Sequence, residues 1–270
     1  MPELPEVETS RRGIKPWIQG ATITRVVGRD RRLRWPEAQG IERNLRRQLI
    51  ESVDRRAKYL LVRTGGGTII LPLGMTGSLF LVDPGAPAGI HDHVDFELDS
   101  GKVLRFRDPR RFGSFHLSRA PLQHPLLAKL GPEPLGDDFD GDYLWHKSRG
   151  RKVSIKQFIM NAQVVVGVGN IYASESLFRA GINPKRAAGR VARHRYAALA
   201  EAIRDILQRA IDAGGTTLRD FYGGDGEPGY FKQQLEVYDR EGEHCRCCNT
   251  LIRAFVQGQR STYYCKSCQT

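Results

Sequence analysis

CRCCNTLIRAFVQGQRSTYYCKSC, residues 245–268, decides the fold at one end of this 270-residue chain. It contains the pattern Cys245-x2-Cys248-x16-Cys265-x2-Cys268, two CxxC turns joined by a segment of β-hairpin length. Four thiolates at this spacing form a tetrahedral cage for Zn²⁺ without an open coordination position, which predicts one structural zinc ion. Disulfides are the alternative, and the reducing cytosol and the paired CxxC turns disfavour them. The fifth cysteine, Cys247, is left over and could compete with Cys248 as a ligand.

Helices are predicted in the part of the chain that precedes the cysteines. Apolar residues recur at helical spacing from Leu199 to Ile211, and Gly214-Gly215 ends this long helix. A shorter helix is predicted from Asn170 to Ala180. Before it, residues 166–169 read Val-Gly-Val-Gly, so backbone N–H groups at a helix N-terminus could approach an anion. A glycine pair alone is weak evidence for such a site, because it is typical of an ordinary tight turn.

Strands are predicted for most of the first half of the chain. A first helix runs from near Pro5 to Ile18, because apolar residues recur there at helical spacing. Residues 94–98 alternate between apolar and polar side chains, and residues 103–107 partly do so. Two apolar runs, residues 58–62 and 68–71, are separated by three glycines and read as a hairpin. Many short strands with turn signals between residues 21 and 117 indicate an antiparallel β-sandwich.

The predicted fold class is therefore α+β. An N-terminal antiparallel β-sandwich with an N-terminal helix precedes a helical domain and a C-terminal β-hairpin zinc finger. The segment 119–149 is rich in Pro, Gly and Asp and is predicted to be a linker. The domain boundaries expected on this basis are 1–135, 136–235 and 236–270.

The charge of the chain favours a polyanionic partner. The net charge is +12 and the sequence pI is about 9.7, with arginine in excess. A protein with a solvated basic surface and no such partner would have the same composition, so the charge alone does not indicate an activity. No apolar run approaches the roughly 20 residues of a membrane span, and the N-terminus lacks the apolar core of a signal peptide. A cytoplasmic protein is expected.

The N-terminus, Met1-Pro2-Glu3-Leu4-Pro5-Glu6, suggests a nucleophile. Removal of Met1 would leave Pro2 with a free secondary amine, which condenses with a sugar aldehyde carbon to a charged iminium. An α-amino pKa near 8 leaves a useful fraction unprotonated at neutral pH. Glu3 could move protons beside it. The alternative is a plain helix start, with prolines and glutamates in the first turn.

Two loops combine cations with exposed apolar residues. Asp108-Pro109-Arg110-Arg111-Phe112-Gly113 holds a turn, two cations and an aromatic ring, and Gly74-Met75-Thr76-Gly77 places a flexible apolar side chain on a tight loop. Such residues can fill the gap left by an extruded base, although core packing would explain them too. The glycine-rich segment 214–230 suggests a mobile lid, or a connector.

These motifs together resemble the formamidopyrimidine-DNA glycosylase family. The matching stretches occur in order along the chain: residues 2–9, 56–60, 91–93, 108–113 and 164–178, and the four cysteines. The resemblance implies a β-sandwich followed by a helix–two-turn–helix domain with a zinc hairpin. It also implies base-excision repair of oxidised purines such as 8-oxoguanine and formamidopyrimidines in double-stranded DNA, with β,δ-elimination by an AP lyase activity. A monomer located at the bacterial nucleoid is expected.

The resemblance also assigns residue roles. Pro2 attacks C1′ of the damaged nucleotide, Glu3 donates the proton at the sugar, and Glu6 is a supporting carboxylate. Lys58 assists phosphate binding and β-elimination, and Arg260 grips the target phosphate and is linked to δ-elimination. The residues implied to contact DNA are His91, Arg151 and Asn170, together with the void-filling Met75, Arg110 and Phe112, of which Arg110 faces the orphaned cytosine.

Two other functions compete with this one. An endonuclease VIII-like glycosylase would excise oxidised pyrimidines, but the Glu3-Leu4-Pro5 opening and the Met-Arg-Phe set favour the purine branch. A noncatalytic zinc-ribbon DNA-binding protein would leave Pro2 and Glu3 unexplained. The sequence does not rank the purine lesions against one another.

Overall fold

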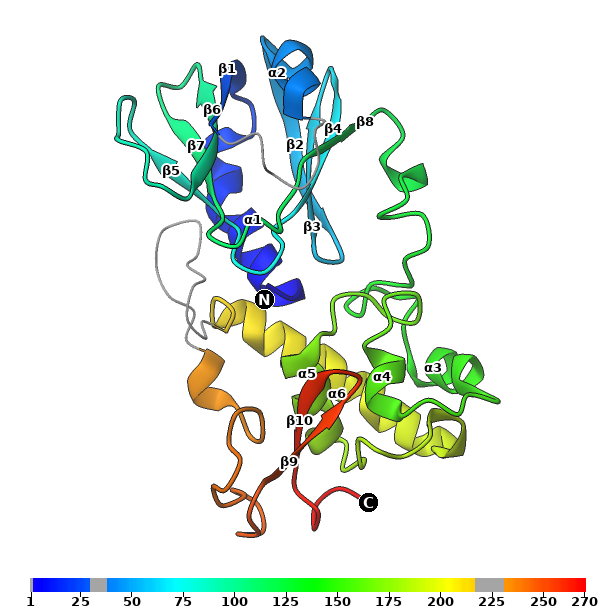
Figure 1. The fold of residues 1–270 in the computed structure, drawn as a ribbon. Coiled ribbons are helices and arrows are strands. Elements are labelled where there is room, and N and C mark those ends of the chain that lie inside the picture. Colours follow the sequence, from blue (N-terminus) through cyan, green and yellow to red (C-terminus); the bar gives the residue numbers. More distant parts are fainter. Residues whose placement is uncertain (1, 30–37, 217–230) are drawn as a thin grey trace. The chain divides into compact units, whose positions relative to one another are not determined.

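The computed structural model describes residues 2–29, 38–216 and 231–270 (Figure 1). Most of the predicted lid, residues 217–230, lies outside the described residues, as does Met1. The chain divides into two compact units, one formed by Met1–Ala128 with Ala213–Tyr230 and one by Lys129–Asp212 with Phe231–Thr270. The three-domain boundaries expected from the sequence remain a prediction. No helix of the described residues is long and apolar enough to cross a membrane.

The first unit is built on an eight-stranded antiparallel sheet. Its strand order is β5-β7-β6-β1-β2-β3-β4-β8. Strands β1 and β2 pair through only two residue pairs, whereas β2 and β3 pair through six. The sheet thus has two halves, β5-β7-β6-β1 and β2-β3-β4-β8, joined by the short β1–β2 pairing. The strands are β1 (Thr22–Gly28), β2 (Gln48–Arg56), β3 (Tyr59–Thr64), β4 (Gly67–Pro72), β5 (Ser78–Val82), β6 (Asp92–Leu98), β7 (Val103–Arg107) and β8 (His116–Ser118).

Helix α1 (Leu4–Ile18) supplies part of the core between the two halves. Its side chains Val7, Ile14 and Ile18 are fully buried and belong to one cluster with residues of strands from both halves. Their spacing of three to four residues, or multiples of it, places them on one helix face. The predicted helix and the predicted sandwich are both confirmed. The helix stops at Ile18, and Gly20 follows in a left-handed conformation (φ 85°).

Helix α2 (Ala38–Leu45) interrupts the predicted run of strands. Its residues Ile41 and Leu45 are separated by one helical turn and are buried in the same core cluster. Eight residues with three apolar side chains cover only about two helical turns, too short a stretch to establish a helical period, which is why this helix was not predicted.

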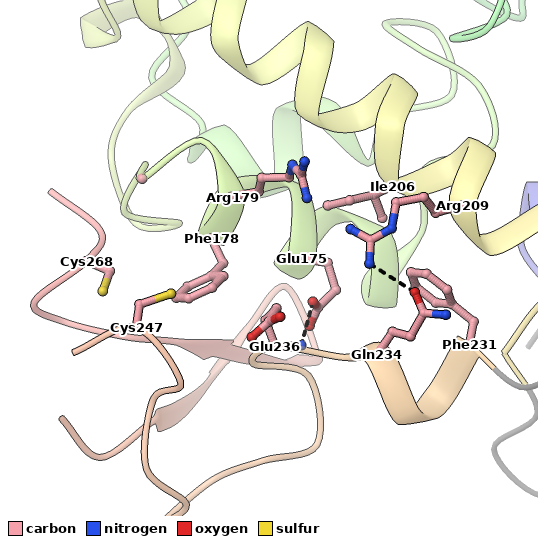
Figure 2. A pocket seen from close by; sticks show the side chains of 11 residues that line it. Glu175, Phe178, Arg179, Ile206, Arg209, Phe231, Gln234, Glu236, Cys247 and Cys268 are labelled. Atoms are coloured by element: carbon pink, nitrogen blue, oxygen red, sulfur yellow. Dashed lines mark hydrogen bonds between the residues drawn. The ribbon is translucent and has the colours of Figure 1, made fainter. Parts of the chain in front are cut away.

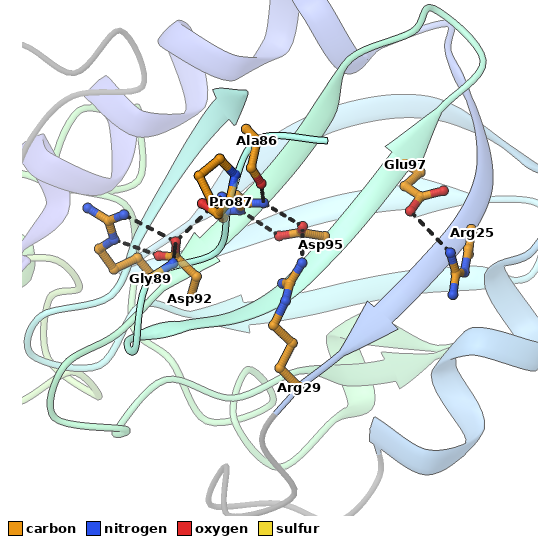
Figure 3. Close-up of polar contacts among 10 residues, drawn as sticks. Arg25, Arg29, Ala86, Pro87, Gly89, Asp92, Asp95 and Glu97 are labelled. Carbon is orange, nitrogen blue, oxygen red and sulfur yellow. Dashed lines mark hydrogen bonds and ion pairs between the residues drawn. The ribbon is translucent and has the colours of Figure 1, made fainter. Parts of the chain in front are cut away.

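Ion pairs around two buried aspartates fix the segment between β5 and β6 (Figure 3). The side chain of Asp92 accepts hydrogen bonds from Arg107 at 2.6 and 3.2 Å, and Asp95 accepts two from Arg105 at 2.9 Å. Arg105 also donates to the carbonyls of Ala86 and Pro87. Burial raises the pKa of both aspartates, and the arginines outweigh that effect, so each pKa lies below its usual value.

The second unit contains four α-helices and a two-stranded hairpin among its described residues. The long helix α6 and the shorter helix α5 confirm the predicted helices. Helix α3 corrects the linker prediction, because residues 141–148 are helical. Asp140 caps α3 by accepting the Tyr143 N–H at 2.7 Å, and Leu144 is fully buried. The helices are α3 (Gly141–Ser148), α4 (Ile155–Ile159), α5 (Asn170–Arg179) and α6 (Arg193–Asp212), with short 3₁₀ turns η1 (Pro121–Gln123, in the first unit), η2 (Ala188–Arg190) and η3 (Phe231–Gln234).

Strands β9 (Arg253–Gln257) and β10 (Arg260–Tyr264) form the predicted C-terminal hairpin. The two residues between them, Gly258 and Gln259, both have positive φ angles, 55° and 61°. This is the type I′ turn that matches the twist of a two-stranded ribbon. The turn places Arg260 at the start of β10, directly opposite Gln257.

Glu8 ties α1 to the hairpin of β2 and β3. Its carboxylate accepts hydrogen bonds from Arg11 at 2.7 and 2.9 Å, from Arg12 at 3.0 Å and from Arg55 at 3.2 Å. Burial raises the pKa of Glu8, but hydrogen bonds from Arg11 and Arg12 outweigh it and lower the pKa to about 2.

A depressed carboxyl pKa stabilises the fold at pH values above the unfolded pKa, 4.5, and this contribution is lost as the pH falls towards 2. We expect Glu8→Gln to lower the free energy of unfolding by about 1–2 kcal/mol at pH 7, after allowance for solvent screening, and by much less at pH 2.5. Urea unfolding at both pH values measures the difference. Glu97→Gln is the control, because the Arg25–Glu97 pair is exposed and 3.6 Å long. An equal loss for Glu8→Gln at both pH values would contradict the assignment.

Candidate active site

The N-terminus of α1 is fixed by a buried carboxylate. Glu6 is 2 % exposed, and its Oε2 accepts the backbone N–H of Glu3 at 2.8 Å. Its Oε1 accepts the N–H of Thr216 at 2.8 Å. Pro2 and Glu3 are also buried. One side chain therefore fixes the backbone of Glu3, the residue next to Pro2, and holds the segment that returns to this unit after α6.

Gly215 makes the contact with Glu6 possible. It has a left-handed backbone (φ 83°), and a Cβ atom there would lie 3.3 Å from both Cγ and Oε1 of Glu6. A side chain at this position would strain the backbone and crowd the carboxylate. Glycine is thus required by conformation and by close approach.

Lys58 lies at the tip of the β2–β3 hairpin. The preceding residue, Ala57, is buried and has a φ of 55°, which is unfavourable for a residue with a side chain. Arg55 stabilises this turn by donating to the Ala57 carbonyl at 2.8 Å while it also binds Glu8. The ion cluster at α1 therefore ties the turn before Lys58 to the helix that follows Pro2 and Glu3.

Four further candidates of the first unit gather around two loops. His91 accepts the Asp108 N–H through its carbonyl at 3.0 Å, so it adjoins the loop of Arg110 and Phe112. The guanidinium of Arg110 lies 5.1 Å from the centre of the Phe112 ring. Met75 is on the neighbouring loop, which touches the first. Arg110 is exposed, and Met75, His91 and Phe112 are half-buried.

In the second unit, a buried lysine joins Asn170 to the hairpin of Arg260. Lys156 is 1 % exposed, and its ammonium donates to Asn170 Oδ1 at 2.7 Å, to the Ser261 carbonyl at 3.0 Å and to Thr262 Oγ1 at 2.8 Å. Asn170 Nδ2 donates to the same Ser261 carbonyl at 3.0 Å. All three donors of the lysine are satisfied. Asn170, the first residue of α5, is thereby locked beside the residue that follows Arg260.

Arg151 is exposed on the loop between α3 and α4. Its backbone N–H donates to the Ser148 carbonyl at 3.0 Å, and its carbonyl accepts the Gly189 N–H at 2.9 Å. A Cβ on Gly189 would lie 2.9 Å from that carbonyl oxygen, so only glycine permits the contact. The loop is well anchored, but no described contact links Arg151 to Asn170 or Arg260.

The four predicted cysteines converge. The Sγ atoms of Cys245, Cys248, Cys265 and Cys268 all lie within 4.8 Å of one another, and two of the pairs are 3.4 and 3.9 Å apart. Zn–S bonds of about 2.3 Å in a tetrahedron place sulfur atoms roughly 3.8 Å apart, so the group fits a Zn²⁺ ion. These separations are too long for disulfides. Cys247 is exposed and is not part of this group of four.

Glu175 anchors the segment that leads into the hairpin. Its carboxylate accepts the backbone N–H groups of Glu236, Val237 and Tyr238 at 2.8–3.0 Å. Burial raises the pKa of this group, and the three amides act in the opposite direction. Figure 2 shows Glu175 beside Glu236 in the wall of a cavity of about 390 Å³, which Cys247 and Cys268 also line.

The structure thus collects the predicted residues into local groups. The groups of the first unit are Pro2, Glu3 and Glu6 at the start of α1, Lys58 in the β2–β3 turn, and the two loops that carry Met75, Arg110 and Phe112. The groups of the second unit are Asn170 with the hairpin of Arg260, and the four cysteines. Sequence reasoning missed Thr76, Lys156 and Glu175. A lysine or glutamate on a short or amphipathic helix gives no sign that it is buried, so their sequence carried no signal of these contacts.

Comparisons with known proteins identify the family of the chain. A family model described as the formamidopyrimidine-DNA glycosylase N-terminal domain matches residues 1–115, and one described as the H2TH domain of the same enzymes matches residues 130–222. The chain is 60 % identical to the formamidopyrimidine-DNA glycosylase of Stutzerimonas stutzeri and 57 % identical to that of Pseudomonas aeruginosa, over 269 residues and the full length of each.

Solved structures give the same result. The MutM (Fpg) protein of Thermus thermophilus superposes with a TM-score of 0.88 at 36 % identity, covering 99 % of this chain and 98 % of the other. A Lactococcus lactis Fpg complex with Fapy-dG-containing DNA gives a TM-score of 0.90 at 32 % identity and 99 % coverage of both chains.

Fold and site together define a DNA glycosylase with a sheet domain, a helical domain and a cysteine hairpin. The chain belongs to the formamidopyrimidine-DNA glycosylase family, since family models match most of it and relatives match all of it.

Removal of the Lys156 ammonium should weaken the link between Asn170 and the hairpin, although the hydrogen bond from Asn170 Nδ2 to the Ser261 carbonyl stays in place. Lys156→Met keeps the length of the side chain but removes the donor to Asn170 Oδ1, to the buried Thr262 Oγ1 and to the Ser261 carbonyl, of which the last keeps its hydrogen bond from Asn170 Nδ2. We expect the free energy of unfolding to fall by about 3 kcal/mol, and affinity for duplex DNA to fall by about tenfold or more. Urea unfolding and fluorescence anisotropy measure the two quantities.

Lys152→Met is the matched control for the loss of one positive charge, because Lys152 is exposed on the loop before α4. It should leave stability unchanged and weaken DNA binding only slightly. If both variants behaved alike, Lys156 would act through its charge and not through the link between Asn170 and the hairpin.

Proposed function

We propose that this protein excises oxidised purines from double-stranded DNA with the amine of Pro2 as its nucleophile. As a member of its family it is a DNA glycosylase with AP lyase activity, and it acts in base-excision repair. The observation that carries the proposal is the full-length identity of 57–60 % to formamidopyrimidine-DNA glycosylases. The Lactococcus lactis relative has been crystallised with DNA containing Fapy-dG and with DNA containing an abasic site, which supports purine lesions as substrates.

Base loss begins with attack of the Pro2 nitrogen on C1′ of the damaged nucleotide. The N–C1′ bond forms, the glycosidic bond breaks with its electron pair on the departing base, and ring opening leaves an iminium at C1′. Glu3 supplies the proton at the sugar. Glu6 supports this chemistry by fixing the Glu3 backbone. The amine exists only once Met1 has been removed.

Strand cleavage follows from the same intermediate. The iminium withdraws electrons from C2′, so a C2′ proton is easily lost and the 3′ phosphate leaves in β-elimination. A second elimination expels the 5′ phosphate. In our proposal Lys58 assists the first elimination and Arg260 is linked to the second.

The remaining candidates bind the flipped-out form of the DNA. Lys58, Asn170 and Arg260 contact phosphates, and His91 and Arg151 are further DNA contacts, which accords with the net charge of +12. Met75, Arg110 and Phe112 fill the gap left by the extruded nucleotide, and Arg110 faces the orphaned base. Flipping costs a few kcal/mol, which these contacts offset.

A zinc ion held by Cys245, Cys248, Cys265 and Cys268 is part of the proposal. When bound it supplies folding energy to a small hairpin, and four thiolate ligands leave it no position for water or substrate. The hairpin then carries Arg260, and Lys156 and Asn170 bind its second strand. The protein would act in the cytoplasm, at the nucleoid.

The alternatives receive less support. An endonuclease VIII-like preference for pyrimidines has no counterpart among the relatives described above. A noncatalytic zinc-ribbon protein would have no need of a carboxylate that orients Glu3.

Borohydride trapping on an 8-oxoguanine:cytosine duplex tests the nucleophile. Mass spectrometry first establishes that Met1 is absent. Borohydride reduces an iminium to a stable amine, so the unmodified protein should become covalently joined to DNA, and acetylation of the N-terminal amine should abolish this product. If a blocked protein still traps DNA, a lysine such as Lys58 is the nucleophile.

Glu3→Gln separates base removal from binding in the same assay. It should bind the duplex normally and excise the base about 10²–10⁴ times more slowly. On a pre-formed abasic site, where the base is already absent, trapping should largely survive. Excision at the normal rate would refute the role of Glu3.

The role of the metal is tested with Cys248→Ser. Loss of one thiolate should release the ion and unfold the hairpin, so DNA binding should be lost while the β-sandwich keeps its circular dichroism. Arg260→Ala is the matched control, because it should keep the metal and lose only part of the affinity and strand cleavage. Metal content and DNA affinity are measured for both. Normal cleavage of damaged DNA by a zinc-free protein would overturn this role.

A further inference from the structure

Two loops of the first unit touch through their backbones. Gly74, beside Met75, has a left-handed conformation (φ 69°). A Cβ atom there would lie 2.5 Å from the carbonyl carbon of Phe112 and 2.6 Å from the nitrogen of Gly113. No side chain fits in that space, so the loop that carries Met75 rests directly on the loop that carries Phe112.

A buried carboxylate and a hydroxyl join the same two loops. The side chain of Asp108 is fully buried, and its Oδ1 accepts the Thr76 hydroxyl at 2.5 Å. Its Oδ2 accepts the Gly113 N–H at 2.7 Å. The Thr76 oxygen accepts the Arg110 N–H in return, at 3.1 Å. Thr76 therefore binds the opposite loop both as donor and as acceptor.

The backbone of Asp108 adds two further contacts. Its carbonyl accepts the Arg111 N–H at 3.2 Å, and lies 2.8 Å from Nε2 of the buried His93. Arg111 adopts a positive φ of 55° in this turn. A buried carboxylate is costly unless its oxygens are hydrogen-bonded, and here both bind groups that fix the shape of the loops.

We propose that the Asp108–Thr76 pair is a positioning unit that holds Met75, Arg110 and Phe112 at a fixed mutual spacing. It thereby sets how strictly the enzyme distinguishes the base opposite the lesion. The inference rests on the proposed function, in which these three side chains enter the gap left by the flipped nucleotide.

The physical reason is preorganisation. Three side chains that enter one gap must be ordered together, and a scaffold that has already ordered them lowers the cost of insertion. Arg110 depends on it most, because its backbone N–H is bound by the Thr76 hydroxyl. An arginine reads a base through hydrogen bonds of fixed geometry, so a small displacement of its backbone weakens the distinction between cytosine and adenine.

Thr76→Val tests the unit, because valine keeps the shape of threonine and removes both hydrogen bonds. Single-turnover excision of 8-oxoguanine is measured opposite cytosine and opposite adenine. We expect the ratio of the two rates to fall roughly tenfold. Thr76→Ser retains the hydroxyl and should restore the ratio of the unmodified protein.

Thr64→Val is the matched control for lost stability. Thr64 is also buried, and its hydroxyl donates to the Gly67 carbonyl at 2.8 Å in the β3–β4 turn. Thr64→Val should lower the free energy of unfolding about as much as Thr76→Val does, while the cytosine:adenine ratio of excision rates stays unchanged. If Thr76→Val does not fold, Asp108→Asn is the second variant. Asparagine keeps the volume of the side chain, but its amide group cannot replace both acceptor oxygens, so one of the two carboxylate contacts is lost. The cytosine:adenine ratio of excision rates should then fall in the same way.

Trapping on single-stranded abasic DNA keeps this inference distinct from the proposed function, because that substrate has no opposite base. All variants should trap there as the unmodified protein does. Failure of the unmodified protein to trap both this DNA and the 8-oxoguanine:cytosine duplex would refute the Pro2 chemistry. Normal trapping together with an unchanged cytosine:adenine ratio in folded Thr76→Val or Asp108→Asn would refute the positioning unit.

Discussion

The two hydrogen bonds of the Glu6 carboxylate are the contact on which the first unit depends. One oxygen binds the amide of Glu3 and the other binds the amide of Thr216. Because the carboxylate is buried at the start of α1, it is costly unless both oxygens are paired, and the positive end of the helix favours its charge. The same group thus orders the N-terminus and closes the unit with a segment from beyond α6.

The same device recurs wherever a functional side chain is positioned. Asp108 joins the loop of Met75 to the loop of Arg110 and Phe112, Lys156 joins α5 to the cysteine hairpin, and Glu175 holds the segment that leads into that hairpin. Each is a buried ionisable group whose hydrogen bonds go to backbone or neutral polar atoms of another segment. Directional bonds of this kind fix loop positions more narrowly than apolar contacts, which tolerate sliding.

The sequence predicted those parts of the fold that are encoded locally. The spacing of Val7, Ile14 and Ile18, the alternation of β6 and the CxxC turns each specify an element within a few residues. Helix α3 was taken for linker because a single cap and one buried leucine specify it. Lys156 was missed because its partners Ser261 and Thr262 lie 105 and 106 positions away, and nothing near residue 156 marks their approach. The family resemblance supplied roles that spacing alone does not contain.

The division of the first unit between two stretches of chain also constrains its biosynthesis. Glu6 leaves the ribosome 210 residues ahead of Thr216, its partner. At usual elongation rates, roughly 10 to 40 s pass between the synthesis of Glu6 and that of Thr216. In this time the part of the second unit that ends with α6 is also made. During translation the N-terminus, where the proposed nucleophile lies, therefore gains this contact only late in synthesis, although its residues are made first.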